Sequence, residues 1–162
     1  MNVSFTLDGK KLTVSVPAEM PLSQLLREHS VSFRRFAPCG FGECGLCVVL
    51  FDDKPTLSCL LPMYRVAGGT VVTPQGLLDS PKVRPAELGL ARAGIEPCDA
   101  CAPALLVTMV ALLSITPTPS DKELERYAAS VKCDCLPTHR LARGMRFALE
   151  FDRKRSHGAR RP

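Results

Sequence analysis

The sequence lacks any long hydrophobic run, has no tryptophan, and contains only three histidines. Its most apolar segment, Leu105–Leu113, is interrupted by Thr108 and is far shorter than the roughly 20 residues that span a bilayer. Residues 1–7 have neither the basic region nor the apolar region of a secretory signal. We therefore expect a cytoplasmic protein without a membrane span, whose cysteines are reduced and available to bind metal.

Catalytic and nucleic-acid-binding patterns are also missing. His29, His139 and His157 lie apart from any pattern of acids or nucleophiles, so we interpret them as surface or local structural residues and expect no catalytic group. The segment 153–162 has five basic residues and no acid, which accounts for the net charge of +5 and leaves the remainder near neutral. We expect a disordered basic tail and no nucleic-acid partner, because a nucleic-acid-binding domain is basic over its folded part.

Cysteine, by contrast, is abundant: the chain has eight, in two groups. The first group reads Cys39-Gly-Phe-Gly-Glu-Cys44-Gly-Leu-Cys47 and continues to Cys59, which gives the spacing C-x4-C-x2-C-x11-C. Plant-type ferredoxins use this arrangement, three ligands in one tight loop and a fourth farther along, to surround a [2Fe–2S] cluster. The spacing predicts such a cluster on Cys39, Cys44, Cys47 and Cys59.

The glycines between these cysteines support the same interpretation. Gly40, Gly42 and Gly45 can adopt the positive φ values of a loop that points backbone N–H groups at sulfur. Zinc favours two well-separated cysteine pairs over a triplet and a single residue. Disulfides need an oxidising compartment, for which the sequence gives no indication.

The second group consists of Cys98-Asp-Ala-Cys101 and Cys133-Asp-Cys135, separated by 31 residues. Each pair precedes a predicted helix, whose free N–H groups and dipole favour a thiolate-bound cluster. Four cysteines can also bind zinc, so the spacing alone does not distinguish an iron–sulfur cluster from a zinc site. A thioredoxin-like redox pair is disfavoured because no βαβ pattern surrounds C-x2-C.

The first half of the chain predicts a small sheet. Residues 3–7 and 12–16 alternate apolar and polar side chains around Asp8-Gly9, which indicates a β-hairpin. Leucines at helical spacing predict a helix over residues 21–29, and apolar runs predict strands at 48–51 and 70–73. A hairpin, a helix and two further strands are typical of a β-grasp fold.

The second half predicts helices only. We expect them over residues 83–94, 102–115, 120–129 and 137–151; the third begins with the capping box Ser120-Asp-Lys-Glu123. Four short helices suggest a four-helix bundle. The predicted fold class is therefore α+β, with a ferredoxin-like domain at 1–76, a four-helix bundle at 77–152, and the tail at 153–162.

Both cysteine groups, taken in this order, resemble the small iron–sulfur subunit of the molybdenum hydroxylases, the family of xanthine dehydrogenase, aldehyde oxidoreductase and carbon monoxide dehydrogenase. Thr73-Pro-Gln-Gly-Leu77 is also similar to the segment that joins the two domains in that family. The resemblance implies a second [2Fe–2S] cluster on Cys98, Cys101, Cys133 and Cys135. It also implies a non-catalytic chain that relays electrons from a large molybdenum–pterin subunit to FAD on another subunit or to an external acceptor.

The chain departs from the family around the second group. Pro97 stands where the family has a glutamine that approaches the pterin, and Asp99 and Asp134 add negative charge beside the cysteines. Two alternatives therefore stay open. One is the electron-transfer subunit of a flavin-dependent dehydrogenase complex, and the other is a non-redox adaptor that binds zinc. The sequence does not indicate a substrate or a terminal acceptor.

Overall fold

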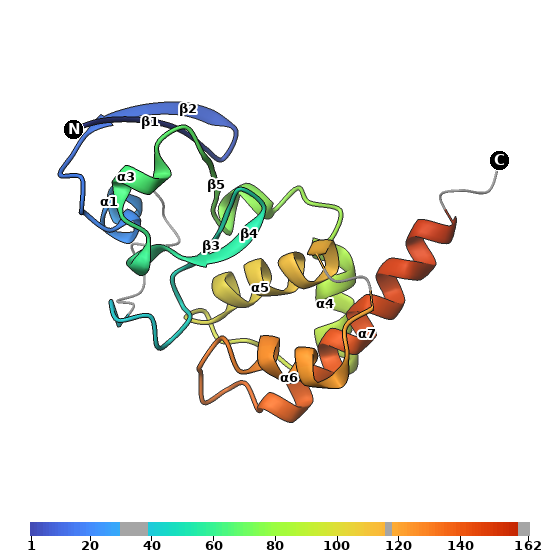
Figure 1. Ribbon diagram of the computed structural model, residues 1–162. Helices are drawn as coiled ribbons and strands as arrows, with labels where there is room; N and C mark the ends of the chain where they lie inside the picture. Colours follow the sequence, from blue (N-terminus) through green and yellow to red (C-terminus); the bar gives the residue numbers. More distant parts are fainter. Residues whose placement is uncertain (30–38, 116–117, 159–162) are drawn as a thin grey trace.

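The structure, a computed structural model, describes residues 1–29, 39–115 and 118–158. It has an α+β fold in which a sheet, with small helices on one side, lies beside the helices of the second half of the chain (Figure 1). This confirms the predicted α+β class. Among the described residues, no helix is both long and apolar enough to cross a membrane.

The N-terminal half forms a five-stranded sheet with the order β2-β1-β5-β3-β4. β1 and β5 are parallel, and the other neighbouring strands are antiparallel. Asp8 and Gly9 both have positive φ (47° and 79°), as a two-residue hairpin turn requires, which confirms the predicted hairpin. The strands are β1 (Asn2–Leu7), β2 (Lys10–Ser15), β3 (Val48–Phe51), β4 (Lys54–Leu57) and β5 (Thr70–Val72).

The edge strand β4 was not predicted. Pro55 disfavours a strand in the sequence because proline has no N–H to donate. In the structure Pro55 pairs with Leu50 at the sheet edge, where a missing donor is tolerated.

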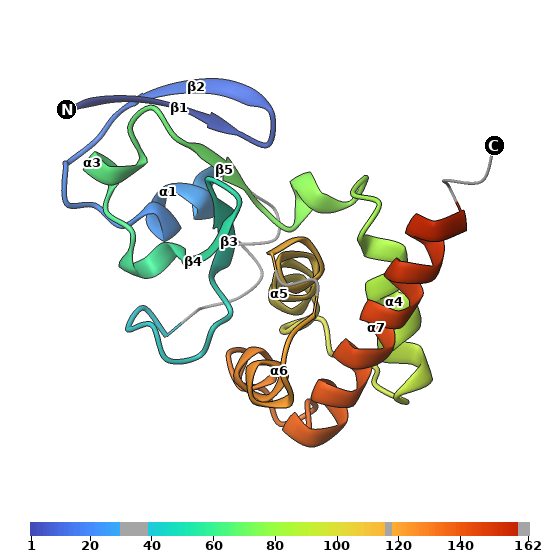
Figure 2. The same cartoon turned by 45° about the vertical axis from the view of Figure 1, so that its right-hand side comes forward.

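Strand β3 packs on both of its faces. Val49 belongs to the buried cluster beneath α1 (Leu22–His29) and α3 (Met63–Val66), together with Val3 and Met63. Val48 and Leu50, which point the opposite way, join the buried cluster of the helical half. The sheet therefore lies between α1 and α5 (Figure 2).

The helical half contains α4 (Val83–Arg92), α5 (Ala102–Ile115), α6 (Asp121–Ala128) and α7 (Thr138–Gly158). The predicted capping box is present, with Ser120 Oγ accepting from the Glu123 N–H. α4 packs mainly against α7, where Gly89 approaches Gly144 so closely that a Cβ at Gly89 would lie 2.4 Å from the Gly144 carbonyl oxygen. α5 is buried on nearly all sides because it separates the sheet from the other helices.

The prediction of a disordered tail from residue 153 is wrong for residues 153–158, because α7 continues to Gly158. Lys and Arg are good helix formers, and basic residues are favourable near a helix C-terminus. Ser156 Oγ also donates to the Asp152 carbonyl oxygen, and Arg155 pairs with the Asp152 carboxylate at 3.7 Å. Residues 159–162 of the predicted tail lie outside the described residues.

Candidate metal centres

The second cysteine group forms one compact set of four sulfur atoms. The Sγ atoms of Cys98, Cys101, Cys133 and Cys135 all lie within 4.8 Å of one another. Cys101 Sγ is 3.6 Å from Cys98 Sγ and 3.3 Å from Cys135 Sγ, and Cys133 Sγ is 3.4 Å from Cys135 Sγ. The loop before α5 and the loop before α7 thus bring together two pairs that are distant in sequence.

These four thiols differ in their exposure and in their pKa, because they differ in burial and in backbone contacts. Cys101 is fully buried immediately before α5, and burial raises the pKa of its thiol. Cys98 is exposed, and the backbone N–H of Cys101 lowers the pKa of the Cys98 thiol to about 7. Cys135 is exposed as well, and its Sγ accepts a hydrogen bond from the Cys98 N–H. This set is therefore buried at Cys101 and exposed at Cys98 and Cys135.

The first cysteine group lies in the loop before β3. Cys39 Sγ accepts hydrogen bonds from the N–H groups of Phe41, Glu43 and Cys44, each at 3.4 Å. Cys44 Sγ accepts from the N–H groups of Cys39 and Leu46 at 3.5 Å. The Cys44 N–H, followed by those of Phe41 and Glu43, lowers the pKa of the Cys39 thiol to about 6. The loop is thus arranged to stabilise negative charge on sulfur before any metal binds.

Three glycines give this loop its shape. Gly40, Gly42 and Gly45 have φ values of 79°, 77° and 74°, which confirms the predicted positive φ. Gly42 also lies directly on Leu60, because a Cβ there would be 2.6 Å from Leu60 Cδ1. The residue that follows Cys59 is therefore packed onto the loop that carries the other three cysteines.

Cys47 and Cys59 form the buried side of the first group. Ser58 holds them together, since its N–H and Oγ both donate to the Cys47 carbonyl oxygen, at 3.1 and 2.7 Å. Burial, followed by a hydrogen bond with the Cys47 thiol, raises the pKa of Cys59 to about 11. Cys39 is near enough for its charge to raise that pKa further, so the loop and the turn after β4 converge.

The donors of both sets are of the type that an iron–sulfur cluster uses, but among the described residues the second set alone has its sulfur atoms gathered into one metal-binding group. Each supplies four thiols, and all eight cysteines are free of disulfides. Four sulfur ligands favour zinc or an iron–sulfur cluster over harder metals. The N–H groups directed at Cys39, Cys44 and Cys135 are the kind of contact that tunes an iron–sulfur centre.

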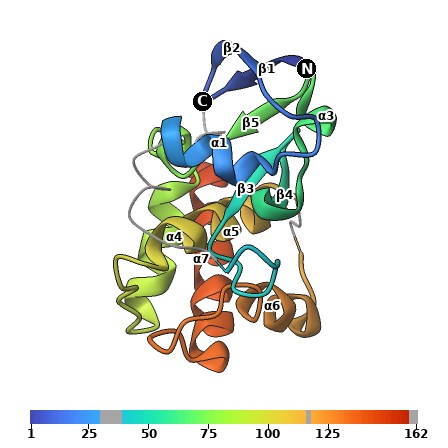
Figure 3. The same cartoon turned by 90° about the vertical axis from the view of Figure 1, so that its left-hand side faces the viewer.

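The two sets are joined by a contact that the sequence did not reveal. The Lys132 N–H donates to the Cys44 carbonyl oxygen at 2.9 Å, one residue before Cys133. Gly45 fits against the Ser130 carbonyl oxygen so tightly that a Cβ would lie 1.8 Å from it. The loop before β3 thus lies against the end of α6 (Figure 3). No local pattern could predict this contact, because it depends on how the sheet packs on the helices.

The chain is similar to several characterised proteins, although no family model matches it. It is 31% identical to the isoquinoline 1-oxidoreductase subunit alpha of Brevundimonas diminuta, over 82% of this chain and 88% of that one. It is 26% identical to the nicotinate dehydrogenase small FeS subunit of Eubacterium barkeri, over 93% and 96% of the two chains. In fold it matches a chain of quinoline 2-oxidoreductase from Pseudomonas putida 86, with a TM-score of 0.76, 26% identity and coverage of 95% and 96%. The chain belongs to the family of small iron–sulfur subunits of the molybdenum hydroxylases.

Proposed function

We propose that this chain is an electron-transfer subunit carrying two [2Fe–2S] clusters, with no catalytic residue of its own. Cys39, Cys44, Cys47 and Cys59 would hold one cluster, and Cys98, Cys101, Cys133 and Cys135 the other. When bound, such clusters accept and release single electrons. The free thiols are consistent with a reducing compartment, so we propose the cytoplasm.

The hydrogen bond between Lys132 and Cys44 is the observation that carries this proposal. It connects the two cysteine sets through backbone alone, because Lys132 directly precedes Cys133 and Cys44 is itself a proposed ligand of the first set. Gly45 removes the side chain that would push the two loops apart. This backbone contact supports a relay, because it joins the loops that carry the two cysteine sets.

Electrons would enter the chain at the exposed edge of one cysteine set and leave it at the exposed edge of the other. Cys98 and Cys135 are exposed on one set. On the other, the large side chains next to the cysteines are open, with Phe41 80% and Leu60 61% exposed. The relatives are subunits of larger oxidoreductases. We propose a large molybdenum–pterin subunit at the Cys98 edge, and FAD on a further subunit or an external acceptor at the Phe41 edge.

Two domains would accompany this division of roles. Residues 1–76 would form a β-grasp, ferredoxin-like domain, and α4 to α7, within residues 77–152, a four-helix bundle. The body of α7 beyond residue 152 would be an extension of that bundle.

Metal analysis of the purified chain tests the proposal. We expect about four iron and four acid-labile sulfide per chain, with visible absorption and two distinct EPR signals after reduction. Stoichiometric zinc with little iron, in a colourless protein, would instead support the structural adaptor. Assays for molybdenum, pterin and flavin in the native complex then separate the two redox alternatives. Flavin without molybdenum would identify a flavin-dependent dehydrogenase.

A further inference from the structure

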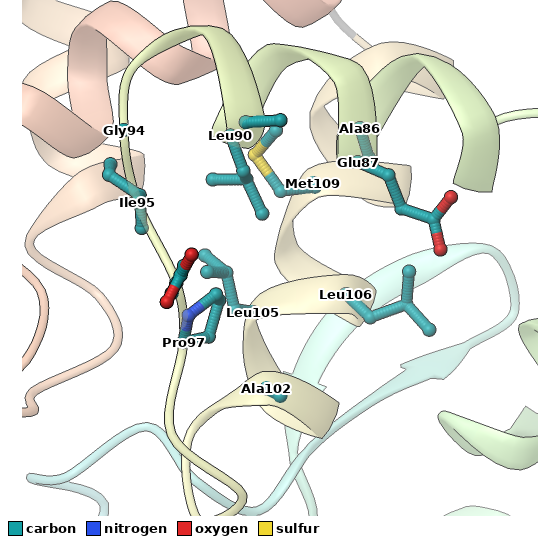
Figure 4. A pocket seen from close by; sticks show the side chains of 12 residues that line it. Ala86, Glu87, Leu90, Gly94, Ile95, Pro97, Ala102, Leu105, Leu106 and Met109 are labelled. Carbon is teal, nitrogen blue, oxygen red and sulfur yellow. The ribbon is translucent and has the colours of Figure 1, made fainter.

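An open groove of about 540 Å³ lies between α4, α5 and the segment 94–97 (Figure 4). We call it the α4–α5 groove. Leucine side chains from both helices point into the space, with Met109 at its inner wall. Its apolar lining includes Leu90, Ile95, Pro97, Leu105, Leu106 and Met109.

The groove is present because α4 and α5 each pack against other elements. α4 is held against α7 by the close approach of Gly89 and Gly144. α5 packs on β3 and β4. Leu106 is the exception in an otherwise buried stretch of α5 from Ala104 to Leu113, and Leu90 is half-buried opposite it. Apolar side chains at such an opening are typical of a surface that a partner covers.

The rim of the groove has exposed carboxylates, and one cation, the Arg140 guanidinium, donates to the carbonyl oxygen of the lining residue Gly94. Glu87 and Glu96 line it, and both are exposed. Asp99 adds a further exposed carboxylate two residues beyond Pro97. Within the described part of the chain, the one ion pair on this rim is Arg84–Glu87 at 3.6 Å, and both of its side chains are more than half exposed. A partner with basic residues beside an apolar side chain would complement this surface.

We propose that the α4–α5 groove receives an apolar side chain of the large partner subunit, next to a Lys or Arg that pairs with Glu96. This inference rests on the proposed function. Pro97 lines the groove and is bonded to Cys98, so an occupant would hold the partner directly beside the exposed edge of the second cysteine set. Docking there would fix the distance over which electrons enter the chain.

The test uses the native complex, isolated through a tag on this chain. Leu106→Ser is compared with Ile115→Ser, a change to an exposed residue at the other end of the same helix. Glu96→Lys is compared with Glu125→Lys, which reverses an exposed charge on α6 outside the groove. We expect Leu106→Ser and Glu96→Lys to release the large subunit at several-fold lower NaCl concentration than the wild type, while both controls behave as wild type. Visible absorption and thermal melting of each variant show that the fold and the clusters remain.

A photo-crosslinking residue at position 106, with position 115 as control, identifies the occupant. The expected product at 106 joins the large subunit through a peptide containing an apolar residue next to Lys or Arg. Crosslinks to a second copy of this chain, or to an acidic peptide, would overturn the proposal. Equal retention of the large subunit by all four variants would overturn the proposed docking at the groove and leave the proposed function standing. A colourless wild type without a large subunit would overturn the proposed function.

Discussion

The Lys132 N–H donates a hydrogen bond to the Cys44 carbonyl oxygen, with an N···O distance of 2.9 Å. This bond ties the loop of the first cysteine set to the residue that precedes Cys133 of the second. Sheet and helices therefore meet at the two candidate metal centres as well as in the apolar core formed by β3 and α5.

Gly45→Ala should damage this contact, because the new Cβ would lie 1.8 Å from the Ser130 carbonyl oxygen. Gly40→Ala is the matched control: its φ is also strongly positive, but a Cβ there has nothing within 4 Å. We expect Gly40→Ala to cost about 1–2 kcal/mol of unfolding free energy from backbone strain, and Gly45→Ala clearly more. Thermal melting gives the stabilities, and EPR of the fully reduced protein reports the magnetic coupling between the centres. Equal melting temperatures and unchanged coupling in the two variants would show that the contact has no such role.

Cys101→Ser should remove the second centre and spare the first. Cys101 is fully buried, and among the described residues its group contains only the other three cysteines, so no further His, Cys, Asp or Glu is in place to substitute for it. Iron should fall from about four to about two per chain, and the ferredoxin-type EPR signal should remain. If both signals disappear from a protein whose circular dichroism is still native, the two centres do not assemble independently.

The local parts of both centres could be predicted from sequence. The spacing of Cys39, Cys44 and Cys47, the positive φ of the intervening glycines, and the Ser120–Glu123 cap each depend on a few consecutive residues. Residue type alone restricts such segments to a few conformations, so the expectation and the structure agree.

The remaining features depend on packing between distant segments. Pro55 lies in a strand because β4 is at an edge, which local sequence does not indicate. Asp152, where the extension of α7 begins, forms an ion pair with Lys82 at the start of α4, a contact between residues that are distant in sequence. The α4–α5 groove and the Lys132–Cys44 contact likewise follow from how helices and sheet are placed, so no spacing pattern reports them.

Thiol reactivity of the metal-free chain should follow the two pKa values in the first set. The pKa of Cys39 is lowered to about 6 by the N–H groups of Cys44, Phe41 and Glu43, so Cys39 is mainly thiolate at neutral pH. The pKa of Cys59 is raised to about 11 by burial and by Cys47, so Cys59 stays a thiol there. Because the thiolate is the nucleophile, iodoacetamide should alkylate Cys39 with a midpoint near pH 6 and leave Cys59 unmodified until strongly alkaline pH. Mass spectrometry of the digested protein measures both; preferential labelling of Cys59 at neutral pH would contradict the assigned loop geometry.

The Lys82–Asp152 ion pair should stabilise the protein more than the exposed pairs do. Lys82 Nζ lies 2.6 Å from Asp152 Oδ2, and the two side chains are 26% and 12% exposed. Lys82→Met would leave the Asp152 carboxylate largely buried, with Oδ1 lacking a hydrogen bond and Arg155 at 3.7 Å as its remaining partner. After allowance for the exposed part of Lys82, we expect a loss of about 1–3 kcal/mol.

Arg84→Met is the matched control for that change, since it removes a cation from an ion pair whose side chains are 72% and 59% exposed. Its cost should stay within about 0.5 kcal/mol, as is usual for surface pairs. Adding Asp152→Leu to Lys82→Met should recover part of the lost stability, because an apolar pair of similar volume avoids the unpaired charge. Urea unfolding of the four proteins, including the wild type, measures these differences. A double variant less stable than Lys82→Met would mean that the Asp152 carboxylate stabilises α7 through a contact other than the one with Lys82, such as its ion pair with Arg155.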